Sequence, residues 1–128
     1  MKTFSQLVAE SAKNIDEIFP WDLEEKNDSP PILLDIREPY EFDAMHIKDS
    51  INVPRGILET ACEYDFEETV PELVEARKHE IVVICRSGNR SIFAAEVMLK
   101  MGYRNVVSLK TGLRGWVDYE LPLVDANE

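Results

Sequence analysis

Two stretches, 81–84, which is wholly apolar, and 32–36, which is apolar except for Asp35, dominate the hydrophobic pattern of the chain. Each run is short and rich in branched aliphatic residues, which is typical of a strand buried on both faces of a parallel sheet. Three further stretches, which mix apolar and polar residues, predict strands at 15–19, 51–53 and 106–109. The pattern therefore predicts five strands.

The segments between these strands carry apolar positions at helical spacing. They predict helices at 3–13, 20–26, 39–45, 56–64, 67–78, 92–101 and 111–116. A turn is expected at 27–31, and the acidic tail after Pro122 is expected to fray. Strands that alternate with helices favour an α/β fold, in which helices cover both faces of a mostly parallel sheet.

The composition adds constraints on size and partners. A chain of 128 residues suits one domain, which can fold without disulfides or a metal. The formal net charge of −11 argues against nucleic acid and anionic membrane surfaces as partners. The acidity serves either solubility alone or protein partners with basic faces.

Cysteine usage and the start of the chain suggest a compartment. The two cysteines, Cys62 and Cys85, do not make a disulfide framework. The first residues form no signal-peptide core, and no apolar run is long enough to span a membrane. We therefore expect a cytoplasmic location, where thiols stay reduced. Without a His/Cys cluster at ligand spacing, no metal site is expected.

The segment 85–91 is the strongest candidate for chemistry. Cys85 directly follows the strand predicted at 81–84, and the helix predicted at 92–101 begins just after the segment. Ligands bind at this edge of open α/β sheets. Loop N–H groups and a helix N-terminus favour an anion there, and the same field favours a thiolate. Cys85 is thus predicted to be a nucleophile.

The rest of this loop suits the binding of an anion. The guanidinium groups of Arg86 and Arg90 match oxyanions, and Gly88 allows a tight turn with positive φ. Ser91 is predicted to cap the helix, so that its N–H and its hydroxyl both face the loop. We expect the substrate-binding residues to be Arg86, Ser87, Gly88, Asn89, Arg90 and Ser91.

The length of the loop distinguishes two kinds of chemistry. Cysteine phosphatases place five residues between their cysteine and arginine, whereas four lie between Cys85 and Arg90. The pocket formed by this shorter loop fits a sulfur atom on the cysteine better than a phosphate group. A persulfide is therefore favoured over the phosphocysteine of a cysteine phosphatase, and an arsenate reductase is disfavoured with it.

The loop and two upstream segments resemble the single-domain rhodaneses. Residues 33–42 are similar to the family's first strand signature, and residues 46–54 to its HIPGAINIP segment. Ala94, Ala95, Gly112, Gly115 and Trp116 extend the match beyond the loop 85–91. The resemblance implies a five-stranded parallel sheet flanked by helices and a single domain over 1–128. Its core runs from about 15 to 123, with an N-terminal helix 3–13 and an acidic tail 124–128.

The resemblance also implies an activity, that of a thiosulfate sulfurtransferase. The Cys85 thiolate would take a sulfane sulfur from a small anionic donor and pass it to a thiophilic acceptor. The reaction would proceed through the covalent persulfide on Cys85 and would need no cofactor. Arg86 would hold the donor, and Arg90 would brace the loop or help to hold the anion. The alternative is a carrier or interaction module that relays sulfur between proteins. A monomer or weak dimer is expected.

Asp35 and Arg37 are predicted as supporting residues. Asp35 is expected to accept N–H bonds at a strand end, or else to orient the active loop. Arg37 is expected to pair with a carboxylate, or else to contact substrate. The family places the counterpart of His46 in a structural turn. Cys62 is expected to be a bystander, and the alternative is a second thiol that reacts with Cys85.

Three residues depart from the family pattern. Met45, Asp49 and Thr111 stand where glycines are usual. All three positions belong to turns, so the departures concern local geometry rather than chemistry.

Overall fold

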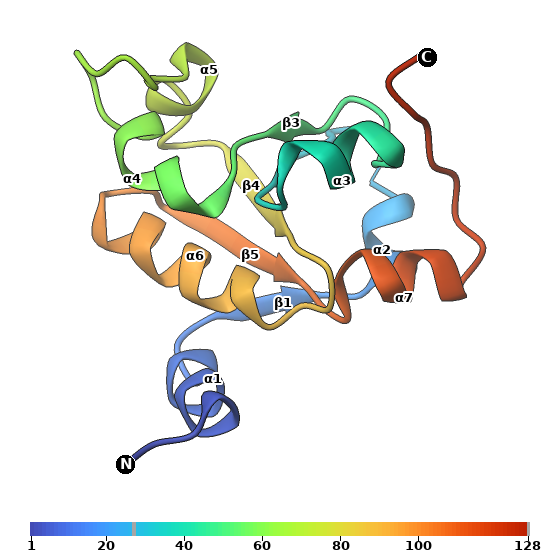
Figure 1. Ribbon diagram of the computed structural model, residues 1–128, viewed down its shortest axis with the longest axis horizontal. Helices are drawn as coiled ribbons and strands as arrows, with labels where there is room; N and C mark the ends of the chain where they lie inside the picture. Colours follow the sequence, from blue (N-terminus) through green and yellow to red (C-terminus); the bar gives the residue numbers. More distant parts are fainter. Residues whose placement is uncertain (27, 128) are drawn as a thin grey trace.

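The computed structural model describes residues 1–26 and 28–127, and within them five strands form one sheet (Figure 1). The strands are β1 (Asp16–Ile18), β2 (Ile32–Asp35), β3 (Ile51–Asn52), β4 (Glu80–Ile84) and β5 (Asn105–Leu109). Their order is β1-β5-β4-β2-β3, and every neighbouring pair is parallel. The predicted five-stranded parallel sheet is confirmed, with strand boundaries shifted by no more than one residue.

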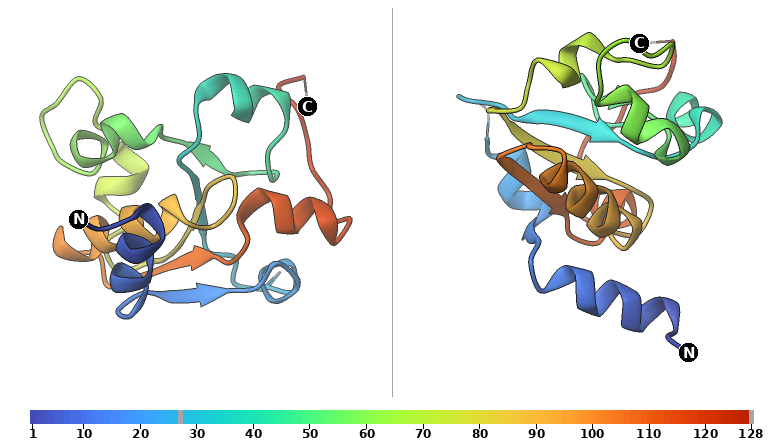
Figure 2. Two further views of the ribbon diagram at one scale, coloured as in Figure 1. Left: turned by 60° about the horizontal axis from the view of Figure 1, so that its bottom comes forward. Right: turned by 90° about the vertical axis from the view of Figure 1, so that its left-hand side faces the viewer.

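Helices cover both faces of this sheet, as predicted (Figure 2). They are α1 (Phe4–Ala12), α2 (Pro20–Glu24), α3 (Pro39–Ala44), the 3₁₀ helix η1 (Arg55–Ile57), α4 (Leu58–Ala61), α5 (Pro71–Val74), α6 (Arg90–Lys100) and α7 (Gly112–Asp118). Successive side chains of β4 alternate between the faces. Ile81 and Val83 pack with α4, α5 and α6, whereas Val82 and Ile84 pack with α2 and α7. The apolar run at 81–84 is therefore buried on both sides.

The N-terminal helix α1 lies alongside α6 and projects from the rest of the molecule (Figures 1 and 2). The ring of Phe4 meets the edge of Phe93, with 6.1 Å between the ring centroids. The Ser11 hydroxyl donates to Glu96. Within residues 1–26 and 28–127, no helix is long and apolar enough to cross a membrane.

The helices predicted at 56–64 and 67–78 are wrong in extent. The first is a 3₁₀ turn followed by the single turn of α4, and the second is reduced to α5. Between them the chain forms a loop, because the Thr69 hydroxyl donates to the Glu63 carbonyl and the Val70 N–H to the Ala61 carbonyl. The Thr69 bond runs from a side chain to the backbone, and bonds of this kind compete with helical hydrogen bonds.

The expected fraying of the tail is also wrong for the residues described. Val124 forms an antiparallel bridge with His46, in which each N–H donates to the other's carbonyl at 2.9 Å. The Ala126 N–H donates to the Asp43 carbonyl. These bonds fasten the tail to α3 and the turn after it. Asn27, in the turn expected at 27–31, and Glu128, at the end of the tail, lie outside the described residues.

Candidate active site

Cys85 lies where the central strand β4 ends, and only 4% of the residue is exposed. The neighbouring strands β5 and β2 end on either side of it, because all three strands are parallel. The following loop leads into α6, which begins at Arg90. The structure thus places Cys85 at the carboxyl edge of the sheet, beside a helix N-terminus, as the sequence predicts.

The sulfur of Cys85 receives hydrogen bonds from the loop. The Gly88 N–H donates to Sγ at 3.1 Å, and the Ser91 N–H donates to it at 3.4 Å. The Ser91 hydroxyl lies 3.3 Å from Sγ and 2.6 Å from the hydroxyl of Ser108 in β5. Both serine residues are completely buried. These contacts place donors around the sulfur, which favours a negative charge on it.

Ser91 does not cap the helix as predicted. Asn89 occupies the N-cap position without a side-chain bond, and α6 begins at Arg90, so Ser91 belongs to the first turn. The prediction fails because α6 starts two residues before the apolar pattern does. The N–H and hydroxyl of Ser91 nevertheless both face the sulfur, as expected.

Two glycines let the loop pack closely against the start of α7. Gly88 has φ of +88°, and a Cβ there would lie 2.7 Å from the Thr111 nitrogen. Gly112 has φ of +61°, and a Cβ there would lie 2.6 Å from the Cys85 carbonyl oxygen. The Leu113 N–H donates to that same carbonyl at 2.9 Å. The loop is therefore held from outside as well as from within.

A cleft of about 400 Å³ opens over Cys85. Four arginines contribute to its walls: Arg37, Arg55, Arg86 and Arg90. Glu38 and Glu41 are the acidic residues of the lining, so positive side chains outnumber negative ones. Among the described residues, Arg86 and Arg90 make no ion pair within 4.0 Å. Ser87 and Asn89 also face the cleft.

Sequence reasoning gave no site role to six residues of this cleft, among them Arg55 and Phe4; the other four, Ile36, Glu38, Tyr40 and Glu41, lie in the segment 33–42. Arg55 comes directly after the segment 46–54, and its guanidinium pairs with Glu59 at 2.9 Å. Its position directly after the segment 46–54, which resembles the family, could have indicated that Arg55 lies near the site. Phe4 reaches the cleft from α1, and its apolar spacing in the sequence suggested only packing.

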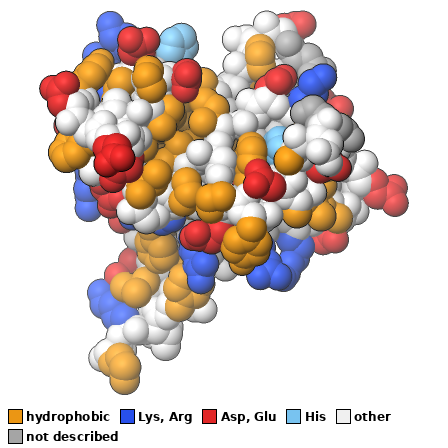
Figure 3. Space-filling model, turned by 45° about the horizontal axis from the view of Figure 1, so that its top comes forward, with side chains coloured by type: hydrophobic (Ala, Val, Ile, Leu, Met, Phe, Trp, Pro, Cys, Tyr) orange, Lys and Arg blue, Asp and Glu red, His pale blue; other side chains and the backbone are white. Residues whose placement is uncertain are grey.

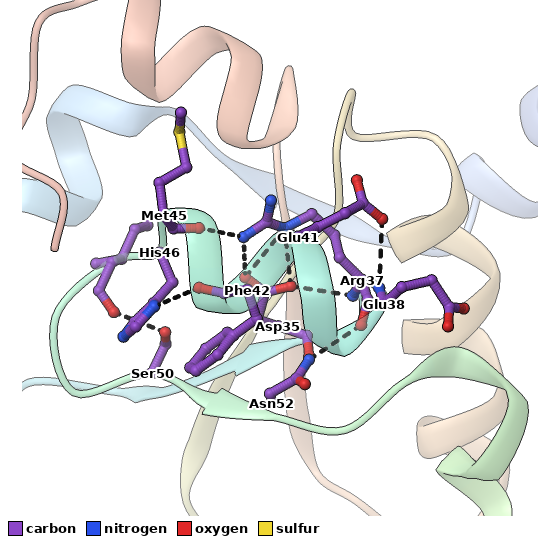
Figure 4. Close-up of polar contacts among 10 residues, drawn as sticks. Asp35, Arg37, Glu38, Glu41, Phe42, Met45, His46, Ser50 and Asn52 are labelled. Atoms are coloured by element: carbon purple, nitrogen blue, oxygen red, sulfur yellow. Dashed lines mark hydrogen bonds and ion pairs between the residues drawn. The ribbon is translucent and has the colours of Figure 1, made fainter. Parts of the chain in front are cut away.

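Asp35 and Arg37 form a buried ion pair beside the cleft (Figure 4). Arg37 Nη2 lies 3.0 Å from Asp35 Oδ2, and the Arg37 backbone N–H donates to Asp35 Oδ1. Both structural expectations for this pair are therefore confirmed. Arg37 Nη2 also donates to the Met45 carbonyl at 2.6 Å, and Asn52 Nδ2 donates to the carbonyls of Asp35 and Arg37. The pair joins the ends of β2, α3 and β3.

His46 makes its own contacts in the turn after α3 (Figure 4). Its Nδ1 lies 2.6 Å from the Phe42 carbonyl, and its ring stacks on the Phe42 ring with centroids 3.7 Å apart. These contacts agree with the structural turn that the resemblance implied for His46.

The three departures from the family pattern have different outcomes. Asp49 and Thr111 adopt left-handed backbone without glycine, with φ of 67° and 64°. Met45 instead has φ of −164°, an extended conformation open to any residue. Only two of the three positions therefore carry a conformational cost.

Cys62 differs from Cys85 in its surroundings. Its side chain is completely buried in the core, and both cysteines are free. Burial raises the pKa of the Cys62 thiol, against the opposing effect of a hydrogen bond with the Tyr103 side chain. Within the described ranges, no cluster of His, Cys, Asp or Glu side chains could hold a metal ion.

Comparison with known proteins settles the family. The model of the rhodanese-like domain matches residues 20–119. The chain belongs to the rhodanese-like family. This match spans the loop over Cys85 as well as the segments 33–42 and 46–54, which carried the resemblance.

Two curated relatives of this rhodanese-like chain carry names that refer to sulfur. YrkF of Bacillus subtilis (strain 168), a candidate sulfur carrier protein, is 36% identical over 110 residues, which cover 84% of this chain and 54% of YrkF. A candidate mitochondrial thiosulfate sulfurtransferase of Schizosaccharomyces pombe is 34% identical over 94 residues, 71% of this chain and 66% of that protein. The chain thus spans between half and two thirds of these relatives.

A solved structure from Rhodopseudomonas palustris superposes with a TM-score of 0.84 at 26% sequence identity. The match covers 97% of this chain and 96% of the other. That protein has unknown function and is described as a possible tyrosine phosphatase. The rhodanese-like fold is therefore shared over almost the whole length.

Proposed function

We propose that this rhodanese-like protein is a sulfurtransferase that carries a sulfane sulfur as a persulfide on Cys85. The observation that carries the proposal is the hydrogen bonding of Cys85 Sγ by the Gly88 and Ser91 N–H groups at the base of an arginine-lined cleft. Donors fixed around a sulfur stabilise its anionic form at little cost in reorganisation. The names of the two relatives, a sulfur carrier and a thiosulfate sulfurtransferase, support the same chemistry.

In the first step, the Cys85 thiolate attacks the outer sulfur of thiosulfate. The S–S bond of thiosulfate breaks, sulfite leaves with the electron pair, and Cys85 becomes a persulfide. The guanidinium groups of Arg86 and Arg90, which form no ion pair with any residue that the structure describes, would hold the dianion in the cleft. Arg55 would add a third positive group on the wall that η1 supplies.

In the second step, a nucleophilic acceptor attacks the terminal sulfur of the persulfide. The electron pair of the persulfide S–S bond returns to Cys85, which regenerates the thiolate. The two displacements predict ping-pong kinetics. The thiolate leaving group is stabilised by the same N–H donors that favour it as a nucleophile.

A second candidate is a sulfur carrier that receives its sulfur from a protein and turns over small molecules slowly. The name of YrkF favours it. A cysteine phosphatase is disfavoured by the four residues between Cys85 and Arg90, although one structural neighbour is described as a possible phosphatase.

The decisive experiment measures sulfur loading by intact mass. After incubation with thiosulfate and removal of the excess, we expect a gain of one sulfur atom, and added cyanide should release it as thiocyanate. Cys85→Ser should abolish both signals, whereas the matched thiol variant Cys62→Ala should retain them.

Other outcomes would favour the alternatives. Loading from a persulfidated protein but not from thiosulfate would favour the carrier. Hydrolysis of a phenyl phosphate ester that depends on Cys85 would contradict sulfur transfer as the main activity.

A further inference from the structure

A second hollow continues from the cleft over Cys85. This groove of about 530 Å³ runs between α3 and α7. Arg37, Tyr40, Glu41 and Arg86 line both the groove and the cleft, so the two spaces are continuous. A ligand whose reactive atom meets Cys85 can therefore extend into the groove.

Apolar side chains form facing parts of the groove's walls, and the rest of its lining is charged, from Arg37, Glu41, Arg86, Arg114 and Asp118. Tyr40 and Met45 form one wall, and Leu113 and Val117 form the other. Tyr40, Met45 and Val117 are 75%, 43% and 44% exposed, so the groove presents apolar surface to solvent. Thiosulfate is a small dianion without apolar atoms, so this surface serves a larger molecule.

Arg86 and Arg114 contribute positive charge to the groove, whose acidic lining residues are Glu41 and Asp118. The Arg114 N–H donates to the Arg86 carbonyl at 3.0 Å, which brings the backbones of the two arginines together. In the part of the chain that the structure describes, neither guanidinium forms an ion pair within 4.0 Å. Arg86, which lines both spaces, and Arg114, which lines the groove, complement a carboxylate on the molecule that reacts with Cys85.

We propose that the groove binds the sulfur acceptor, and that the acceptor is a cysteine in a peptide segment of another protein. A carboxylate beside that cysteine pairs with Arg86 and Arg114, and an apolar side chain a short way along the segment lies between Met45 and Val117. This inference rests on the proposed function, because it assigns the acceptor of the same site.

The transfer step is balanced in atoms and electrons. The acceptor thiol loses its proton to solvent, and the resulting thiolate attacks the terminal sulfur of the Cys85 persulfide. A new S–S bond forms on the acceptor. The old S–S bond breaks, and its electron pair stays on Cys85 as the thiolate.

Two acetylated peptides test the proposal. Both contain an Asp-Cys pair, and two residues later one has leucine and the other has serine. With the persulfidated protein, we expect kcat/KM for transfer to the leucine peptide to be about tenfold higher, which corresponds to partial burial of one leucine side chain.

Groove variants should remove this preference. Val117→Asp and the nearly isosteric Met45→Gln, on opposite walls, should each bring the leucine peptide close to the serine peptide. Loading by thiosulfate and release by cyanide should stay unchanged. Ile57→Asp is the matched control, because Ile57 is 37% exposed and lines neither space. It should preserve the tenfold preference.

A binding measurement separates this inference from the proposed function. Peptides with serine in place of cysteine cannot react, and their dissociation constants can be measured by calorimetry on the unloaded protein. Tighter binding of the leucine version that Val117→Asp abolishes supports the groove, even if no sulfur is transferred. Equal binding and equal transfer of the leucine and serine peptides would overturn the inference while leaving sulfur transfer intact.

Discussion

At the scale of residues, the two cysteines show how surroundings determine the role of a thiol. Both side chains are buried. Cys85 Sγ accepts N–H bonds and borders an open cleft, whereas Cys62 lies in the core, where burial raises its pKa. Reactive cysteines need donors and access, so we propose Cys85 alone as the nucleophile.

The Ser91 hydroxyl is expected to contribute to the reactivity of Cys85. Ser91→Ala removes a hydroxyl 3.3 Å from the sulfur, which accepts from the thiol and can donate to the thiolate, but keeps the backbone N–H bond. A hydrogen bond to a charged group contributes about 1.5 kcal/mol, so kcat/KM for thiosulfate should fall about tenfold. Ser11→Ala, which removes a hydroxyl bonded to Glu96, is the control. An unchanged rate in Ser91→Ala would assign stabilisation of the thiolate to the backbone alone.

Arg55 is expected to help bind an anionic donor. Arg55→Gln removes one positive charge from the cleft, and its side chain is partly exposed, so solvent weakens the effect. Steady-state kinetics should show KM for thiosulfate raised by about threefold with kcat little changed. Arg104→Gln, which changes an exposed arginine outside the cleft, should leave KM unchanged. A similar rise in both variants would attribute the effect to overall charge.

The residues of the candidate site divide into those that the sequence reveals and those that it does not. Residues 85–91 are contiguous, and a strand before them and a helix after them define their geometry, so their place could be predicted. Arg55 and Phe4 reach the cleft through η1 and α1. Their proximity to Cys85 depends on tertiary packing, which no local pattern encodes.

At the scale of elements, the start of α7 supports the active loop at a conformational cost. Thr111, the residue before α7, has φ of 64°, a left-handed conformation that is unfavourable for a β-branched residue. Its side chain also packs against Gly115. The loop thus rests on a strained residue where the family commonly has glycine.

Thr111→Gly should therefore stabilise the protein. Relief of the left-handed backbone outweighs the greater entropy of glycine in the unfolded chain, for a net gain of about 1 kcal/mol in unfolding free energy. Urea denaturation measures it. Asp49→Gly is the control, since aspartate tolerates a φ of 67° better and should gain less. Destabilisation by Thr111→Gly would mean that packing against Gly115 outweighs the strain.

The strands were predicted more accurately than the helices. Runs such as 32–36 and 81–84 stand alone as buried strands, because each is apolar on both faces. The apolar residues of 56–64 and 67–78 belong instead to short turns around a loop. Their spacing resembles a helix, but hydrogen bonds from Thr69 and Val70 define the loop, and those partners become clear only in three dimensions.

At the scale of the whole molecule, an acidic protein surrounds an arginine-rich cleft. The formal net charge is −11, yet positive side chains outnumber negative ones around Cys85. Figure 3 shows acidic and hydrophobic side chains interspersed over one face of the surface. The cleft is thus locally positive, and the acidic exterior disfavours non-specific contact with nucleic acid.

Global stability should fall at alkaline pH. Burial raises the pKa of both Cys62 and Tyr103 above their ordinary values of 9.0 and 10.0. Above pH 9.0 the unfolded chain loses the Cys62 proton first, so the folded state binds more protons and its unfolding free energy decreases as pH rises.

Urea denaturation across this pH range measures the effect. Cys62→Ala should shift the onset of the decrease toward 10.0, where only Tyr103 contributes. Tyr119→Phe, which removes an exposed phenol, should leave the onset unchanged. If the decrease in unfolding free energy began at the same pH in Cys62→Ala and in the parent protein, the effect would not come from the Cys62 thiol.

The contact between the Ser91 and Ser108 hydroxyls lets their hydrogen bonds adapt when the Cys85 sulfur gains or loses negative charge. Their oxygens lie 2.6 Å apart, and either one can donate. When Cys85 is a thiol, hydrogens can point from the sulfur to Ser91 and on to Ser108. When the sulfur is an anion, both hydroxyls can rotate so that the direction reverses. The protein can therefore follow each gain and loss of charge by turning two O–H bonds, while its heavy atoms stay in place.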